Sequence, residues 1–192
     1  IYETLISFLL VTVIGIAMAI LLWQFPSFSD VIEPYLIVLN SLPKSALAPL
    51  FIVWFGNNMK TIIIAAVSVA VFGTIINIYT GFQSVDPEKI KLIYTLGGTK
   101  RDVLRRVILP SNLPTIISSM KVNIGLSLVG VIIGEFLAAN AGLGYLIIYG
   151  TQVFKLDMVL LSIAILCILA VLLYQGIHFF QWIMTRKFDF HL

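Results

Sequence analysis

Charged residues, cysteine and histidine are all scarce in this sequence. Only 11% of the 192 residues are charged, 12 of them Lys or Arg and 9 Asp or Glu, and this is too little charge to cover a soluble domain. The single cysteine, Cys167, lies in an apolar run, so the sequence supports neither a disulfide nor a cysteine-ligated metal site. His178 and His191 have no carboxylate or cysteine at metal-ligand spacing, and we therefore predict no metal site.

Several motifs that would indicate an enzyme are missing as well. There is no Gly-x-x-x-x-Gly-Lys-Ser/Thr, so the chain is not expected to hydrolyse ATP itself. Gly142 and Gly144 form a Gly-x-Gly, but no strand–helix–strand unit surrounds it, as a nucleotide fingerprint requires. An intramembrane enzyme should have two membrane carboxylates or a Glu-x-x-His pair, and neither is evident, with Glu135 having no acid–base partner nearby. We expect no catalytic residue and no cofactor in this chain.

Apolar residues dominate instead. They make up 60% of the sequence, with a mean hydropathy of +1.06, which predicts an all-α, polytopic membrane protein. Spans of about 20 residues allow roughly five of them, and we place these at 4–25, 34–55, 61–82, 116–138 and 158–184, with a short polar connection at 27–33. We expect one transmembrane domain over 1–192, preceded in the longer protein by an N-terminal segment, since Ile1 follows no start signal.

The basic residues gather in two places and predict the orientation. Six lie between the third and fourth spans, namely Lys89, Lys91, Lys100, Arg101, Arg105 and Arg106, and Arg186 and Lys187 lie near the carboxyl end. Two spans separate the clusters, so the positive-inside rule puts both in the cytoplasm and the first span's amino end outside. The net charge of only +3, confined to these clusters, argues against nucleic-acid binding.

The first half of the polar segment 86–114 reads as a short helix. Asp86 is a suitable N-cap and Pro87 a suitable first residue, because its missing N–H is not needed there. Four apolar residues, Ile90, Leu92, Ile93 and Leu96, follow at helical spacing. Gly97-Gly98 then ends the helix, since glycine accepts the left-handed conformation.

A second short helix is predicted directly after the glycines. Thr99 and Asp102 have the spacing of a capping box. Val103, Leu104, Val107 and Ile108 supply an apolar face, and Leu109-Pro110 should close the unit. We expect the pair to lie along the membrane surface with its basic side in water; the alternative is an ordinary basic loop that obeys the positive-inside rule.

Polar residues within the spans are candidates for a solute path. Asn40, Pro43, Lys44 and Pro49 interrupt the second span, which predicts a broken helix beside protein or a water-filled cavity. Lys44 either lines the path or its inner gate, or snorkels to the interface from a helix start. Asn77 either joins two helices or faces the pore.

The fourth span carries an ionisable residue toward each end. Lys121 is placed near its cytoplasmic start and Glu135 near its far end. The glycine-rich segment 140–145 that follows is predicted to be a re-entrant or interfacial turn.

The polar segment resembles the cytoplasmic Glu-Ala-Ala loop of ABC-importer permeases. That pattern is the tripeptide, three residues, Gly, nine residues, an aliphatic residue, one more, then Leu-Pro, and here Gly97, Val107 and Leu109-Pro110 match it. The tripeptide is replaced by Lys91-Leu92-Ile93, so the acidic residue of the pattern is basic in this chain. This replacement changes the contact that the family's glutamate would make, but it does not change the expected helical shape of the loop.

Two further stretches resemble the nitrate, sulfonate and taurine permease group. One is 42–50, Leu-Pro-Lys-Ser-Ala-Leu-Ala-Pro-Leu, which leads to Trp54-Phe55-Gly56. The other is Glu135-Phe136-Leu137 followed by the turn 142–145, which in that group lies toward the outside. The resemblance implies the type I ABC-importer permease fold, in a multi-pass protein of a prokaryotic cell membrane.

The resemblance also implies the rest of a transport machine. Its partners would be two cytoplasmic ABC ATPase subunits that bind ATP and Mg²⁺, a second copy of this permease, an extracytoplasmic binding protein and membrane lipid. The solute would be a small anion such as nitrate, a sulfonate or taurine, or a small heterocycle such as a pyrimidine vitamin precursor; Lys44 favours an anion. The alternatives from other classes are an ion-coupled secondary carrier, for which intramembrane acids and an inverted repeat are missing, and a membrane scaffold or assembly protein.

Three groups of residues carry these functional predictions. The ATPase-coupling group is Lys91, Leu92, Ile93, Gly97, Gly98, Arg101, Val107, Leu109 and Pro110. The translocation-path group is Asn40, Pro43, Lys44, Asn77 and Glu135. The outer-turn group is Gly142, Gly144 and Tyr145.

Overall fold

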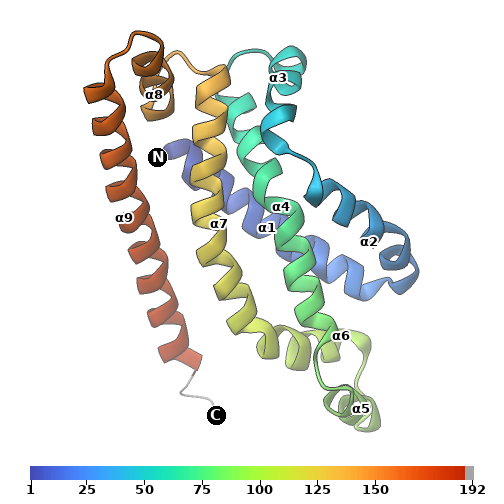
Figure 1. Cartoon of the computed structure of the whole chain (residues 1–192). Coiled ribbons are helices and arrows are strands. Elements are labelled where there is room, and N and C mark those ends of the chain that lie inside the picture. The colour runs from blue at the N-terminus through green and yellow to red at the C-terminus, as the bar shows by residue number, and fades with distance from the viewer. Residues whose placement is uncertain (189–192) are drawn as a thin grey trace. The chain divides into compact units, whose positions relative to one another are not determined.

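The computed structural model describes residues 1–188 and is helical throughout, with no strand in that part of the chain. The helices are α1 (Tyr2–Gln24), α2 (Pro26–Ser41), α3 (Lys44–Phe55), α4 (Met59–Gln83), α5 (Pro87–Thr95), α6 (Lys100–Val103), the π-helical turn η1 (Leu104–Ile108), α7 (Leu109–Ala138), α8 (Leu143–Gln152) and α9 (Leu156–Phe188), and all but η1 are labelled in Figure 1. This architecture confirms the predicted all-α fold.

The predicted number of membrane spans is also confirmed. Four helices are long and apolar enough to cross a bilayer, namely α1, α4, the continuous helix Lys100–Ala138 and α9 over Leu156–Phe179. A fifth span results if α2 and α3 are counted as one broken span. The break was predicted from Pro43 and Lys44, and it lies there: Leu42 and Pro43 have extended backbones and Lys44 begins α3.

The polar connection expected at 27–33 is wrong, because these residues are helical. α2 begins at Pro26, where a proline fits the first turn of a helix, and it continues through Pro34. Ser29 is fully buried and donates its hydroxyl proton to Tyr79 of α4. Ser29 therefore packs against another helix, while Ser27 and Asp30 are exposed on α2.

The predicted end of the second polar-segment helix at Leu109-Pro110 is also wrong. The chain passes from α6 through η1 into α7 without leaving the helix. In η1 the amide of Leu109 bonds to the carbonyl of Leu104, five residues back. Pro110 then falls in the first turn of α7, where its missing N–H is tolerated.

The chain packs as two compact units, each assembled from separate segments. The first comprises 1–11, 43–70 and 120–192. In it α4 and α7 approach at backbone distance, because a Cβ atom on Gly130 would lie only 2.6 Å from the Cα of Ala66. Ile62, Ala66, Val131 and Ala138 form a buried cluster around this approach.

The second unit comprises 12–42 and 71–119 and contains the polar segment. Here too glycines allow close packing: a Cβ atom on Gly15 would lie 2.6 Å from Cγ2 of Thr74, and one on Gly81 would lie 2.6 Å from Oδ1 of Asn112. The segment 86–119 is thus fixed to α4 within its own unit.

Candidate functional site

The first half of the polar segment has the predicted caps at both ends. The Asp86 carboxylate accepts the Glu88 N–H at 2.9 Å, with Pro87 as first residue of α5. At the other end, Gly97 has φ +80°, its N–H bonds to Tyr94 O at 3.0 Å, and the Gly98 N–H bonds to Ile93 O at 2.9 Å. These two bonds are those of a Schellman motif, so the Gly-Gly turn is confirmed in detail.

The two glycines are required for different reasons. Gly97 has a left-handed backbone but open space around it, since no atom lies within 4 Å of the position of a Cβ. Gly98 has no room: a Cβ would lie 2.5 Å from Cγ2 of Ile93 and 2.9 Å from its carbonyl oxygen. Gly97 therefore sets the turn by conformation and Gly98 by close contact.

The second helix begins with the predicted capping box. The Thr99 N–H donates to Oδ2 of Asp102 at 2.8 Å, and the Asp102 N–H donates to the Thr99 hydroxyl at 3.4 Å. The capped start and the glycine turn together fix the angle between α5 and α6.

The apolar residues of the two halves have opposite environments. Val103 and Ile108 are fully buried, and Leu104 and Val107 nearly so, and these four therefore pack within the protein instead of facing lipid. On α5 no residue is buried, and Leu92 and Leu96 are 58% and 76% exposed. Tyr94, two residues from each leucine and so on the other side of the helix, is 48% exposed.

Lys100 is a residue of this site that the sequence analysis did not single out. Its ammonium donates to the carbonyl oxygen of Gln24 at 2.6 Å and lies 5.5 Å from the ring centre of Trp23. A cation at the carboxyl end of a helix satisfies a free carbonyl and the helix dipole. The contact joins residues 76 positions apart, so no local pattern could reveal it.

The predicted coupling residues are thus distributed over one continuous structure. Lys91, Leu92 and Ile93 lie on α5, Gly97 and Gly98 in the turn, Arg101 on α6, Val107 in η1, and Leu109 and Pro110 at the start of α7. Lys91 and Arg101 are both exposed, so the basic side faces solvent as expected.

The residues predicted for a solute path do not gather at one place within either unit. In the second unit, Asn40 lies against Gly73, and the Asn77 amide donates to the Ser119 hydroxyl of α7 at 2.8 Å. In the first unit, Pro43 lies in the break before α3, and Lys44 is the half-buried first residue of that helix.

Glu135 is instead joined to the outer turn. Its Oε2 accepts the Gly144 N–H at 2.6 Å, at the start of α8. A Cβ atom on Gly142 or on Gly144 would lie 2.5 Å or 2.7 Å from atoms of Glu135. The glycines therefore leave space for a carboxylate that caps α8 and suits the positive end of its dipole. Tyr145 stacks on Tyr149, with ring centres 6.0 Å apart.

The outer segment also departs from two predictions. Residues 143–152 form a helix, α8, beyond the short turn that was expected. Glu135 also has an acidic neighbour that the sequence analysis did not identify, because Glu3 of α1 lies close enough in the first unit to interact with it. The two acids are far apart in the sequence, so spacing could not reveal the pair.

Comparison with known proteins supplies the family. Residues 11–187 match the model of the binding-protein-dependent transport system inner membrane component. The chain belongs to this family. The predicted membership of the ABC-importer permeases is confirmed, and with it a multi-pass membrane component.

Relatives and solved structures agree with the family. The chain is 33% identical to the formylaminopyrimidine transport permease protein ThiX of Halalkalibacterium halodurans, over 69% of this chain and 53% of ThiX. It is 29% identical to the taurine transport system permease protein TauC of Escherichia coli, over 87% of this chain and 61% of TauC. It therefore spans about half to two thirds of the length of these relatives.

The fold of the family is recognisable in a solved transporter. A chain of the MetNI methionine ABC transporter, in an inward-facing conformation, matches with a TM-score of 0.77 over 92% of this chain and 88% of that chain. The sequence identity is 18%, so this likeness shows the fold alone, which is that of the type I importer permeases predicted above.

Proposed function

We propose that this chain is the permease subunit of an ATP-driven, binding-protein-dependent importer, and that it is coupled through α5 and α6 to cytoplasmic ATPase subunits. The observation that carries the proposal is the exposed apolar pair Leu92 and Leu96, four residues apart on one face at the carboxyl end of α5. Exposed apolar residues that are contiguous indicate a contact surface.

The rigidity of the α5 surface supports a docking role. Caps hold both of its ends, and the capping box of α6 follows directly. A surface that is already ordered binds with less loss of conformational entropy. Burying each exposed leucine in a partner groove would contribute up to about 1.5–3 kcal/mol. The flanking lysines Lys89 and Lys91 suit a groove with an acidic rim.

The second half of the segment supports a role in transmitting motion. Its apolar side chains are buried, and its backbone continues into α7 as one helix. A displacement of α5 by the ATPase would reach α6 through the short Gly97-Gly98 turn and would then tilt or rotate α7. ATP-driven closure of the ATPase pair would in this way shift the permease between inward-open and outward-open states.

The remaining parts of the machine are proposed on the same basis. They are two ATPase subunits carrying ATP and Mg²⁺, a second copy of the permease, an extracytoplasmic binding protein and surrounding lipid. Asn40, Pro43, Lys44, Asn77 and Glu135 are proposed to serve the solute path, either directly or by holding its walls. The proposed solute is a small heterocycle or a small anion, and relatives named for formylaminopyrimidine and taurine transport support this.

ATP hydrolysis in nanodiscs tests the proposal. The chain in its full-length form is co-expressed with the ATPase encoded beside it, and the neighbouring binding protein is added with a solute screen. We expect loaded binding protein to stimulate hydrolysis and the Leu92→Ala/Leu96→Ala double variant to lose most of the stimulation. Leu160→Ala is the matched control, because Leu160 is 66% exposed and lies on α9, in the other unit. Failure of any ATPase to associate would favour the ion-coupled secondary carrier.

A further inference from the structure

The turn between α8 and α9 holds a phenylalanine in a left-handed backbone conformation. Phe154 has φ +56°, and among residues 1–188 it is the one residue other than glycine with a positive φ. The Phe154 N–H bonds to Thr151 O at 3.3 Å, and the Lys155 N–H bonds to Gly150 O at 2.8 Å. These two bonds form a Schellman motif at the end of α8, with Phe154 at the position where glycine is usual.

The same motif ends α5, where the chain does use glycine. Gly97 takes the left-handed position there, with φ +80°. A Cβ atom is disfavoured in this conformation, and a bulky side chain makes the residue a genuine outlier. Strained residues persist where the rest of the molecule holds them, and they cluster at binding and catalytic sites. Phe154 therefore needs a reason that glycine could not supply.

Packing within the protein does not supply that reason. The Phe154 side chain is 90% exposed, the largest value among the large apolar residues described. The surrounding residues are also exposed and comprise two apolar and four polar side chains, namely Val153, Leu156, Thr151, Gln152, Lys155 and Asp157. An apolar centre within a polar rim is the usual composition of a protein–protein contact, in which a central aromatic residue supplies much of the affinity.

The turn is held in place by close packing of α8 on α9. A Cβ atom on Gly150 would lie 3.0 Å from Cγ2 of Val159 and 3.3 Å from Cβ of Met158, so the two helices meet at short distance next to the turn. The carbonyl of Lys155 accepts the Met158 N–H at 3.1 Å and so ties the turn to the start of α9. An aromatic residue that is already ordered binds with less loss of conformational entropy than a mobile one.

The topology places this turn on the extracytoplasmic side. The helix Lys100–Ala138 can cross a bilayer, and it starts in the basic polar segment that the positive-inside rule puts in the cytoplasm. α8 has ten residues, too few to cross back. α9 therefore begins on the outer side, and the polar side chains of 151–157 favour water there over lipid.

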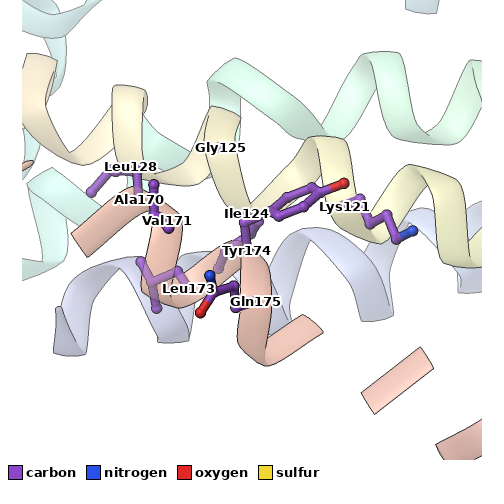
Figure 2. A pocket seen from close by; sticks show the side chains of 9 residues that line it. All are labelled: Lys121, Ile124, Gly125, Leu128, Ala170, Val171, Leu173, Tyr174 and Gln175. Atoms are coloured by element: carbon purple, nitrogen blue, oxygen red, sulfur yellow. The ribbon is translucent and has the colours of Figure 1, made fainter. Parts of the chain in front are cut away.

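Farther along its length, α9 packs more loosely. A cavity of about 440 Å³ lies between α7 and α9 in the first unit, and its lining includes Leu128 of α7 and Tyr174 of α9 (Figure 2). Gly125 also lines it, and no atom lies within 4 Å of the position of a Cβ on this glycine. α9 is thus held at its α8 end and has free space beside its middle.

We propose that Phe154 is an anchor for the extracytoplasmic binding protein, which accepts the ring in an apolar pocket while Lys155 and Asp157 face charged groups at the rim of that pocket. Binding at the turn pushes on the start of α9, and the α7–α9 cavity gives this helix room to tilt. The inference rests on the proposed importer function and deepens it by naming a residue that the binding protein contacts. Lipid and a second copy of the chain are the other candidates for covering the ring.

Variants of Phe154 test the anchor, because glycine should relieve the turn and weaken the contact at the same time. The full-length permease, with the ATPase that co-purifies, is placed in phosphatidylcholine nanodiscs, and the binding protein encoded beside it is titrated by biolayer interferometry. Phe154→Gly and Phe154→Asn should bind it at least about tenfold more weakly than wild type. Their unfolding temperatures should equal that of wild type or exceed it by up to about 4 °C. Phe154→Trp should bind within about threefold of wild type.

Phe179→Ala is the control, because Phe179 is exposed as well but lies near the other end of α9, and it should bind normally. Wild-type affinity in Phe154→Gly would overturn the anchor and leave the importer function standing. A clearly lower unfolding temperature of Phe154→Gly would also overturn it, because the ring would then stabilise the fold. Failure of the binding protein to bind wild type would refute the importer function and the anchor together.

Tryptophan emission of Phe154→Trp, taken as the difference from wild type, identifies what covers the ring. We expect the emission of an exposed tryptophan without the binding protein and a shift to shorter wavelength with it. Quenching by phosphatidylcholine brominated on its acyl chains would show insertion into the bilayer and would overturn the proposal. Short-wavelength emission before the binding protein is added, without quenching by bromine, would show that a second copy covers the ring and would overturn it too.

Discussion

The two helical parts of the polar segment, α5 and the α6–η1 stretch, share a composition but not an environment. α5 and the α6–η1 stretch both combine basic residues with aliphatic ones at helical spacing. The aliphatic residues of α5 are exposed or half-buried, whereas those of α6–η1 are buried in the protein. One half is therefore suited to contact a partner and the other to transmit the contact. Amphipathic spacing predicts that a helix has an apolar face, but not what covers that face.

The largest effect should separate the two halves directly. Ile108→Ala removes a fully buried side chain and should lower the free energy of unfolding by about 2–5 kcal/mol. Leu96→Ala, at a residue 76% exposed, should change it by no more than about 0.5 kcal/mol. Unfolding temperatures in detergent compare the two. The stimulation of ATP hydrolysis by loaded binding protein should nevertheless fall in Leu96→Ala. Normal stimulation in this variant would contradict the assignment of α5 as the part that contacts the partner.

The turn between the halves should respond to conformation at Gly97. Gly97→Val places a β-branched residue at φ +80°, at a strain of about 1–2 kcal/mol, and should uncouple transport from ATP hydrolysis with little loss of expression. Gly97→Asn is the matched control, because asparagine tolerates this conformation. A Gly97→Val variant that transports normally would contradict the role of the turn. Gly98→Ala should uncouple as well, but through its contact with Ile93.

Loss of the α6 cap should have a moderate effect. Thr99→Ala removes the hydroxyl that accepts the Asp102 N–H and should lower stability by about 0.5–2 kcal/mol. Thr99→Ser keeps the hydroxyl and should be close to wild type. Comparison of their unfolding temperatures measures the cap. If Thr99→Ala instead reduced stimulation without any loss of stability, the partner would contact Thr99 itself.

The smallest effect on stability is expected at Lys100. Lys100→Ala removes the hydrogen bond to Gln24 and should lower stability by about 0.3–1 kcal/mol, less at high salt because the contact is exposed. Arg101→Ala, one residue on, breaks no such contact and should not change stability. Salt-dependent unfolding temperatures distinguish the two. A shift for Lys100→Ala that does not depend on salt would argue against an electrostatic contact.

Local signals in the sequence predicted the polar segment well and its continuation poorly. Asp86, Gly97 and Thr99 act on neighbouring backbone groups, so their roles can be read from spacing of a few residues. Leu109-Pro110 was predicted to close the second helix, but the π turn leads directly into α7 and the proline falls in its first turn.

The partners in contacts between distant segments could not be predicted. Glu135 was considered for the solute path and the nearby glycines for a turn, yet the carboxylate bonds to Gly144 within the turn. Lys100 finds its partner 76 residues earlier. Both contacts depend on how helices pack, whereas a hydropathy pattern predicts only which segments are helical. The four spans, or five with the broken α2–α3 pair, followed from that pattern because span length depends on bilayer thickness.

The π turn η1 has a consequence for how this segment can evolve. A π turn amounts to one residue inserted into an α-helix. Deleting a single residue between Leu104 and Ile108 would restore the α-helix and leave the faces of the flanking turns unchanged, because the π turn absorbs the extra residue locally. A second deletion would find no bulge to remove and would rotate everything before it by about 100°, turning buried Val103 toward water. The loss of one residue within η1 should therefore be tolerated across descendants of this sequence more readily than the loss of two.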